Sequence, residues 1–252
     1  MTTRPRDVLL AAGHESLGGA SLRDLLGPGT EAHAAGRDLA AAVRDHAGAV
    51  IVPMTLGRDP DLAATAAQTL AWAGRDRTPG DLLLAEPLGS TEHLVGWIKA
   101  AIGRVMRAGP PPQAVLLSAP AAGRPEEDAE LFKVAHLVGQ GLPVGWVEVA
   151  LTGGRPDVPE SLGRCRLLGA SDVLLVPASF VTAPELDGVR TAGPLLGPAG
   201  LAALIRDRVA TAERRWRLDG DDGLTRGGRA AHHHHDHEHE HNSLERATFH
   251  VG

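Results

Sequence analysis

Short runs of Val, Ile, Leu and Ala alternate along this chain with longer segments whose apolar residues recur at helical spacing. Uninterrupted apolar runs are typical of strands buried on both faces, and their alternation with helices is typical of a parallel sheet. The pattern therefore predicts an α/β fold with parallel strands joined by right-handed crossovers. The predicted strands are Val8–Ala12, Ala49–Met54, Leu82–Ala85, Ala114–Ser118, Trp146–Leu151 and Val173–Val176. The predicted helices are Thr30–His46, Asp61–Ala73, Thr91–Met106, Glu126–Val138, Val158–Leu168 and Ala199–Trp216.

The two sides of a proline-rich bend at Gly109–Pro112 contain similar segments in the same order. Three matches in one order predict two similar α/β units, residues 1–110 and 113–217. The first unit is expected to be the shorter, because the second has an additional strand at Trp146–Leu151. Residues 218–252 are rich in Gly, Asp, Arg and His, which predicts a disordered tail. The matched segments are VLLAAGHES from Val8 with VLLSAPAAG from Val115, VIVPMTLGRDPDL from Val50 with LLVPASFVTAPEL from Leu174, and AEPLGSTEHLVGWIKAAIGRV from Ala85 with AGPLLGPAGLAALIRDRVA from Ala192.

Composition and charge exclude several classes of protein. The chain of 252 residues has a net charge of −6, so it lacks the basic character that nucleic-acid binding requires. Aromatic residues make up only 3%, which argues against stacking on single-stranded nucleic acid. The single cysteine, Cys165, excludes an internal disulfide and fits a reducing compartment. The sequence also lacks a signal-peptide pattern and a membrane-length apolar run, so we expect a cytoplasmic protein with no membrane or nucleic-acid partner.

The tail contains a histidine-rich run, HHHHDHEHEH, at His232–His241. Imidazole nitrogens suit cobalt, nickel, copper and zinc ions, and the interleaved carboxylates add negative charge for a divalent cation. The run therefore predicts a flexible multi-ligand metal site. The alternative is a purification tag, although a tag is normally an unbroken histidine run. The predicted metal ligands in the tail are His232, His233, His234, His235, His237, His239 and His241.

The first candidate site residues follow the first predicted strand. Ligands of open parallel sheets bind beyond the carboxyl ends of the strands, where His14 and Glu15 stand. His14 could be a metal ligand or a proton acceptor, because neutral imidazole does both near neutral pH. Alternatively, it caps the next helix or bonds a loop carbonyl. Glu15 could bind metal or accept a proton, or it could be a solvated loop carboxylate.

Two further candidates, Arg58 and Asp59, follow the second predicted strand. Arg58 could pair with a substrate carboxylate through its forked donors, or it could occupy an ordinary surface position. Asp59 could contribute to the same site, or it could cap a helix with Pro60 at the first helical position.

The other histidines of residues 1–217 are expected to be solvated or packed. His93 follows an expected helix cap at Ser90 or Thr91, and Arg124 and Glu126 are expected to begin a helix in the second unit. The sequence contains no P-loop, no GxGxxG opening a helix after a strand, no GxSxG and no paired CxxC, so no ATP site is expected. The other three histidines are His33, His46 and His136.

Several segments together resemble the class II chelatases, in particular the long CbiX-like sirohydrochlorin cobaltochelatases of the cobalamin pathway. The resemblance covers about residues 7–213, and His-rich tails also occur in that family. In the first half the similar segments are LLAAGHES, VPMTLG with DPDLAATAA, and AEPLG. In the second half they are Glu127–Val138, VEVALTGGRPDVPESLGRCRLLGA, LLVPASFVTAPELDGVR and PLLG.

The resemblance implies two flavodoxin-like halves facing a cleft that holds a tetrapyrrole, with Co²⁺ inserted into sirohydrochlorin. Ni²⁺ or Fe²⁺ are alternative metals, and the substrate could be a related macrocycle. His14 occupies the position of the family histidine after the first strand. The second family histidine is absent, because the chain reads GRDPDL there, and the GHGSR-type motif is altered to GHES. The predicted site is therefore His14 and Glu15 as catalytic residues, Arg58 and Asp59 as substrate contacts, and His14 with the tail histidines as metal ligands.

Two other hypotheses remain beside the chelatase. A non-enzymatic protein of this fold could store cobalt or nickel, or pass it to another cobalamin-pathway enzyme or metal acceptor. The missing histidine and the His-rich tail favour that reading. A scaffold that binds a tetrapyrrole or a partner without metal chemistry is the third, because fold does not determine function.

Overall fold

Two parallel four-stranded sheets with the same strand order form the centre of the protein. The computed structural model describes residues 6–225. Within this range the sheets have the orders β2-β1-β3-β4 and β6-β5-β7-β8, and all neighbouring strands are parallel. The predicted α/β class with two similar halves is confirmed. The strands are β1 (Asp7–Ala12), β2 (Ala32–Ala34), β3 (Ala49–Met54), β4 (Leu82–Leu84), β5 (Ala114–Pro120), β6 (Trp146–Thr152), β7 (Val173–Pro177) and β8 (Arg190–Thr191). The helices are η1 (His14–Gly19), α1 (Ala20–Leu26), α2 (Arg37–Arg44), α3 (Leu62–Ala73), α4 (Thr91–Ala108), α5 (Pro125–Gly139), α6 (Val158–Leu167) and α7 (Pro198–Asp219).

Strand β2 corrects the prediction of one continuous helix over Thr30–His46. Its three residues pair in parallel with β1, where Leu10 stands opposite Ala32. The segment Ala-His-Ala has no β-branched residue, so pairing with a buried neighbour, rather than local preference, places it in the sheet. The two halves therefore match here as well, and β6 is the counterpart of β2 rather than an additional strand.

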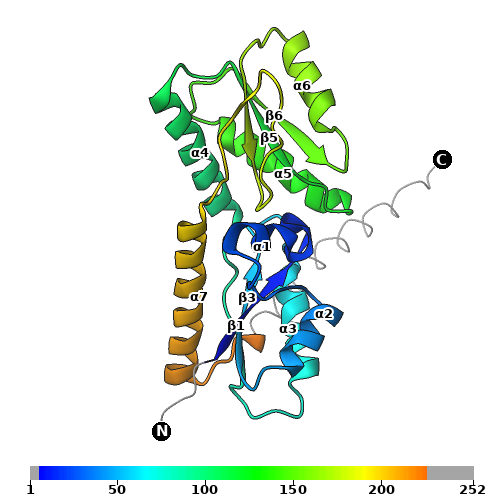
Figure 1. Ribbon diagram of the computed structural model, residues 1–252, viewed down its shortest axis with the longest axis vertical. Helices are drawn as coiled ribbons and strands as arrows, with labels where there is room; N and C mark the ends of the chain where they lie inside the picture. The colour runs from blue at the N-terminus through cyan, green and yellow to red at the C-terminus, as the bar shows by residue number, and fades with distance from the viewer. Residues whose placement is uncertain (1–5, 226–252) are drawn as a thin grey trace, which may run out of the picture.

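The last helix of each half packs against the other half (Figure 1). Helix α7 follows the second sheet in the sequence but contacts β3, β4 and α1 of the first half. Helix α4 follows the first sheet but contacts β7 and α5 of the second half. Each sheet is therefore covered partly by a helix from the other half of the chain.

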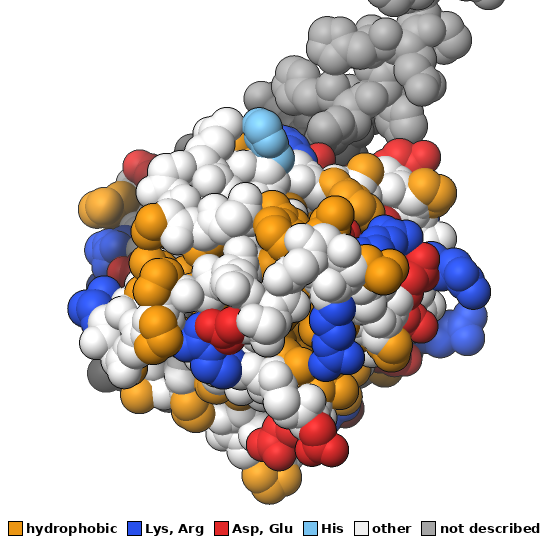
Figure 2. Space-filling view, turned by 90° about the horizontal axis from the view of Figure 1, so that it is seen from above, with side chains coloured by type: hydrophobic (Ala, Val, Ile, Leu, Met, Phe, Trp, Pro, Cys, Tyr) orange, Lys and Arg blue, Asp and Glu red, His pale blue; other side chains and the backbone are white. Residues whose placement is uncertain are grey.

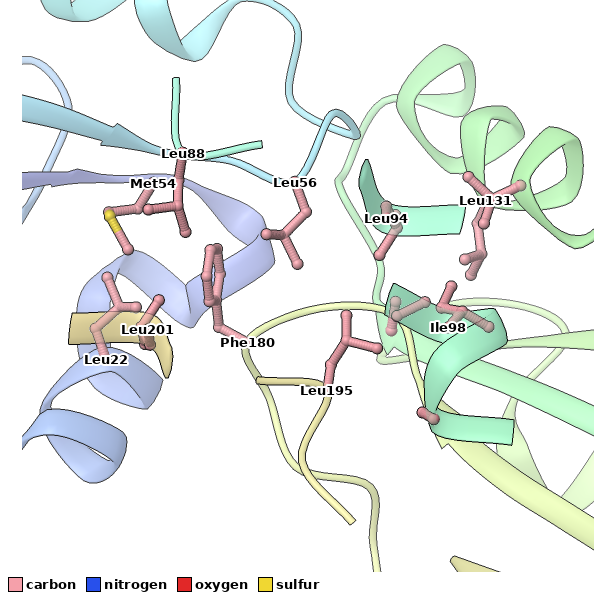
Figure 3. Packing of buried hydrophobic residues seen from close by; sticks show 14 of the residues in the cluster. Leu22, Met54, Leu56, Leu88, Leu94, Ile98, Leu131, Phe180, Leu195 and Leu201 are labelled. Carbon is pink, nitrogen blue, oxygen red and sulfur yellow. The ribbon is translucent and has the colours of Figure 1, made fainter. Parts of the chain in front are cut away.

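The largest hydrophobic core joins the two halves. Phe180 follows β7 and belongs to this core. Its ring lies near Leu56, with Met54 and Leu88 of the first half on one side and Leu195 of the second half on the other (Figure 3). Its backbone N–H donates to the carbonyl of Glu15 at 3.1 Å. Full burial of a phenylalanine contributes roughly 1.5–3 kcal/mol, so this residue helps to fix the orientation of the halves. On the other side of the same core, Leu94 of α4 lies near Leu131 of α5 (Figure 3).

The described part of the segment that was expected to be disordered packs on the first sheet. Helix α7 continues to Asp219, and the N–H of Leu84 donates to the carbonyl of Asp222 at 2.8 Å. The predicted start of disorder at Leu218 is thus wrong. The seven tail histidines lie outside the described residues.

The surface mixes residue types at the end of the molecule formed by the second half. Acidic and basic side chains are interspersed there among apolar ones, rather than gathered by sign (Figure 2). No helix of residues 6–225 is long and apolar enough to cross a membrane.

Candidate active site between the two halves

The candidate site lies beyond the carboxyl ends of the strands, where loops of both halves meet. His14 stands two residues after β1, Asp59 lies in the loop after β3, and Glu127 is in the first turn of α5, which follows β5. In parallel sheets the carboxyl ends of neighbouring strands share one edge, so this topology brings the loops together. Three residues far apart in the sequence therefore converge on one place.

His14 lies between two carboxylates. Its Nδ1 atom is 3.4 Å from Oδ2 of Asp59 and 3.5 Å from Oε2 of Glu127. These distances are longer than a normal N–H···O hydrogen bond and describe close electrostatic contact. The side chains of His14, Asp59 and Glu127 are 12%, 13% and 8% exposed, so water screens these contacts only partly. In the tautomer with hydrogen on Nδ1, that N–H faces the two carboxylates and the lone pair lies on Nε2.

Nε2 of His14 is buried and has no hydrogen-bond partner within residues 6–225. Unpaired buried polar atoms are rare in proteins and often belong to functional sites. No group of three or more His, Cys, Asp or Glu in the described range is arranged as a metal cluster. Both carboxylates approach the same nitrogen, so the three side chains pair with one another instead of surrounding an ion position.

An open hollow of about 430 Å³ adjoins this cluster. Its volume is within the range of about 300–1,000 Å³ that is common for small-molecule sites. The lining comes from both halves of the chain, so the hollow exists only when the halves are assembled. The lining residues are Ala12, Gly13, His14, Gly18, Ala34, Ala35, Asp59, Asp61, Leu62, Thr65, Ala122, Arg124 and Glu127.

Gly13 allows Asp59 to reach His14. A Cβ atom at position 13 would overlap the carboxylate of Asp59. The backbone of Gly13 is extended, with φ −124° and ψ −160°, which other residues also adopt. The requirement for glycine here is therefore space for the carboxylate and not an unusual backbone conformation.

Glu15 has a different environment from the one expected, because its side chain is fully buried. Its Oε1 accepts hydrogen bonds from the Thr55 hydroxyl at 2.5 Å, the Leu56 N–H at 3.0 Å and the Arg58 N–H at 3.2 Å. Burial raises the pKa of Glu15, although the Thr55 hydrogen bond and the Arg58 charge act in the opposite direction. The prediction of a solvated or metal-binding carboxylate is corrected: Glu15 ties the loop after β1 to the loop after β3.

Arg58 is also fully buried and does not line the hollow. Its Nη2 donates to the carbonyl of Pro120 at 3.2 Å and lies 3.9 Å from Oδ1 of Asp128. Burial lowers the pKa of its guanidinium, while the charge of Glu15 counteracts this. This placement corrects both expectations for Arg58, the substrate contact and the surface position. The guanidinium is drawn inward by surrounding carboxylates and joins the two halves.

Asp59 does not cap helix α3. That helix begins at Leu62, with Asp61 at the cap position and no side-chain cap hydrogen bond. Asp59 instead faces His14 at the hollow. The cap predicted at Ser90 is present, because its hydroxyl accepts from the N–H of His93.

Arg124 and Glu127 were missed as site residues. Arg124 stands at the cap position of α5, as expected for the start of a helix. Its Nη2 also donates to Oδ2 of Asp61 at 2.8 Å and to Oε1 of Glu127. The sequence signal that could have identified them is the charged segment Arg-Pro-Glu-Glu-Asp, which begins four residues after the end of the buried strand β5.

The remaining histidines of the described range make contacts outside the hollow. His93 stacks on Trp97. These contacts agree with the solvated or packed roles expected for them. The other pairs are His33 with Glu31, His46 with Asp7 and His136 with Gln140.

The arrangement of two parallel-sheet halves that face a shared hollow is a chelatase-like α/β fold. A solved structure of SirB from Bacillus subtilis with Fe³⁺ is similar to this chain, with a TM-score of 0.52 and 15% identity. The match covers 86% of this chain and 100% of the SirB chain. This similarity confirms the fold suggested by the sequence resemblance.

Two further structures have lower scores. The sirohydrochlorin chelatase SirB from Bacillus subtilis subspecies spizizenii in complex with cobalt has a TM-score of 0.45 and 14% identity, covering 86% of this chain and 99% of its own. CbiX, the terminal enzyme for biosynthesis of siroheme in denitrifying bacteria, has a TM-score of 0.48 and 14% identity, and the match covers 82% of this chain and 99% of the CbiX chain. No family profile and no curated protein sequence matches the chain.

Proposed function

We propose that this protein inserts a divalent metal ion into sirohydrochlorin or a related acidic tetrapyrrole, without ATP. The observation that carries the proposal is an imidazole held between two carboxylates, at a hollow built from both halves. The fold shared with SirB supports it. Within this proposal, Co²⁺ is the metal, Ni²⁺ and Fe²⁺ are alternatives, and the reaction serves cobalamin synthesis in the cytoplasm.

The chemistry assigned to the site follows from proton balance. Insertion of a divalent metal forms bonds to the macrocycle nitrogens and releases two protons from pyrrole N–H groups. His14 accepts one of these protons, and the other passes to water in the open hollow. The negative charges of Asp59 and Glu127 also attract the incoming cation.

The tail histidines act in this proposal as a tethered source of metal. Leu224 lies in a pocket with Leu70 and Gly74, at the end of α3 that is opposite the hollow. Helix α3 has 12 residues and is therefore about 18 Å long. His232 is seven residues beyond Thr225, an extended length of about 23 Å, so the chain length permits delivery to the hollow.

The test is insertion of Co²⁺ into sirohydrochlorin, followed by absorbance, with Ni²⁺ and Fe²⁺ in parallel. We expect wild type to exceed the uncatalysed rate and His14→Ala to lose most of that acceleration. His46→Ala is the matched control, because His46 contacts Asp7 at 2.9 Å at the other end of β1. Equal rates for His14→Ala and wild type would contradict the proposal.

A metal store or metal chaperone is the second candidate, and the His-rich run favours it. It predicts no acceleration of insertion by wild type. It also predicts that Co²⁺ binding disappears when the seven tail histidines are replaced by asparagine in the full-length chain. Under the chelatase proposal, the same variant keeps insertion at high Co²⁺ and loses it only when Co²⁺ is scarce.

A further inference from the structure

Arg124 lines the hollow, and its guanidinium keeps N–H donors that pair with no group of residues 6–225. Its side chain is 56% exposed, and it is the only Lys or Arg among the described residues that line the hollow. Both of its hydrogen bonds use Nη2, so Nε and Nη1 have no partner within residues 6–225. The N–H groups of Nη1 can each donate a charge-assisted hydrogen bond to a carboxylate oxygen.

Glu127 connects this exposed cation to His14. One carboxylate oxygen, Oε1, accepts from Arg124, and the other, Oε2, faces Nδ1 of His14. Asp61 shares the guanidinium on the solvent side. The Glu127 carboxylate thus interacts with two groups, the exposed guanidinium of Arg124 and the largely buried imidazole of His14.

Binding of another anion to Arg124 must change the balance between these two interactions of Glu127. A carboxylate that accepts from Nη1 draws on the same positive charge and weakens the attraction between Arg124 and Glu127. More of the Glu127 charge is then available to a protonated His14 or to a metal ion beside it. The gain is larger than it would be in water, because Glu127 and His14 are largely buried.

We propose that Arg124 binds a carboxylate of the acidic macrocycle and that this binding releases Glu127 to act on the His14 site. The inference rests on the proposed function and deepens it, because it couples substrate recognition at the rim to charge at the reacting atoms. Arg124 is a substrate contact in this scheme, and it acts on the reaction by positioning Glu127.

The binding test compares sirohydrochlorin with its fully methylated ester, which has the same ring and no carboxylates. Loss of a charge-assisted contact lowers affinity by about 10-fold. We therefore expect Arg124→Gln to weaken binding of the acid by about that factor and to leave the ester unaffected, while Arg124→Lys recovers part of the loss. Arg164→Gln is the control, because Arg164 is 49% exposed and pairs with Glu160 on α6 at 2.7 Å.

The coupling test measures Co²⁺ affinity in full-length chains whose seven tail histidines are asparagine. Arg124→Gln leaves Glu127 unneutralised, so we expect it to tighten Co²⁺ binding several-fold, whereas Arg164→Gln should not. The thermal unfolding midpoints of the variants control for damage to α5.

The outcomes separate the two proposals. Equal weakening of acid and ester by Arg124→Gln, or an unchanged Co²⁺ affinity, overturns the inference and leaves Arg124 a structural residue of α5. If wild type binds sirohydrochlorin without inserting metal into it, the proposed function fails. The affinities of wild type and Arg124→Gln for sirohydrochlorin and for its ester still decide the role of Arg124. If wild type binds neither macrocycle, both proposals fail.

Discussion

Replacement of Glu15 tests whether buried charge holds the site together. The Glu15 carboxylate accepts three hydrogen bonds from the loop after β3, and the same loop carries Arg58 and Asp59. Because His14 adjoins Glu15 and Asp59 adjoins Arg58, these bonds fix the spacing between His14 and Asp59. Loss of the carboxylate should therefore affect both the stability of the fold and the geometry of the hollow.

The expected magnitude follows from what the substitution leaves behind. Glu15→Ala leaves three buried donors without their acceptor, and an unsatisfied buried donor costs about 1–3 kcal/mol. It also leaves the Arg58 guanidinium without its nearby buried anion, and breaking such a pair costs about 3–5 kcal/mol. The two estimates overlap, so we expect the free energy of unfolding to fall by about 3–5 kcal/mol in total.

Urea unfolding followed by tryptophan fluorescence measures this change. Glu15→Gln keeps an acceptor oxygen for these donors, so its loss should be smaller than that of Glu15→Ala. Glu31→Ala is the control, because Glu31 forms a partly exposed pair with His33 that is worth at most about 1 kcal/mol. If Glu15→Ala lowers stability no more than Glu31→Ala does, the assignment of Glu15 as the tie between the loops is wrong.

Three further predictions concern pH and the geometry of the hollow. Burial raises the pKa of Glu15 above 4.5, so the folded state binds this proton more tightly than the unfolded state does. The free energy of unfolding should then fall as pH rises from about 4.5 through the raised pKa, and urea titrations at several pH values should lack this contribution in Glu15→Gln. Gly13→Ala should displace the Asp59 carboxylate and slow metal insertion by at least about 10-fold. The free energy of unfolding should change by less than about 1 kcal/mol. An unchanged insertion rate would count against a role for Asp59. Asp59→His places a second imidazole at the hollow and should insert metal at least as fast as wild type. A loss as large as that of Asp59→Ala would mean that the carboxylate charge is required.

The strands could be predicted because burial on both faces leaves a simple pattern. All six residues of β3 are buried, and its apolar run is evident in the sequence. The short edge strand β2 carries no such pattern, because it pairs with one neighbour and contains no β-branched residue. Its identity depends on a contact with β1 that local sequence does not encode.

The site was predicted only as far as the edge of the sheet on which it lies. The position after the first strand correctly brought His14 to the hollow, since strand ends in parallel sheets share an edge. The position of a residue after a strand does not predict whether its side chain is buried between the halves or faces the hollow. Arg58 and Asp59 are adjacent in sequence, yet one is buried between the halves and the other faces the hollow.

The exchange of α4 and α7 explains why the remaining site residues escaped prediction. Periodicity indicates that a helix has a buried face, but it does not say which sheet covers that face. Here each terminal helix packs on the opposite half, so the two sets of loops are held at a fixed separation. Glu127 reaches His14 only because of that arrangement, and Arg58 strengthens it through the carbonyl of Pro120. A site that takes His14 and Asp59 from one half and Glu127 from the other requires both halves in register, and this accounts for two buried charges, Glu15 and Arg58, at the point where the halves join.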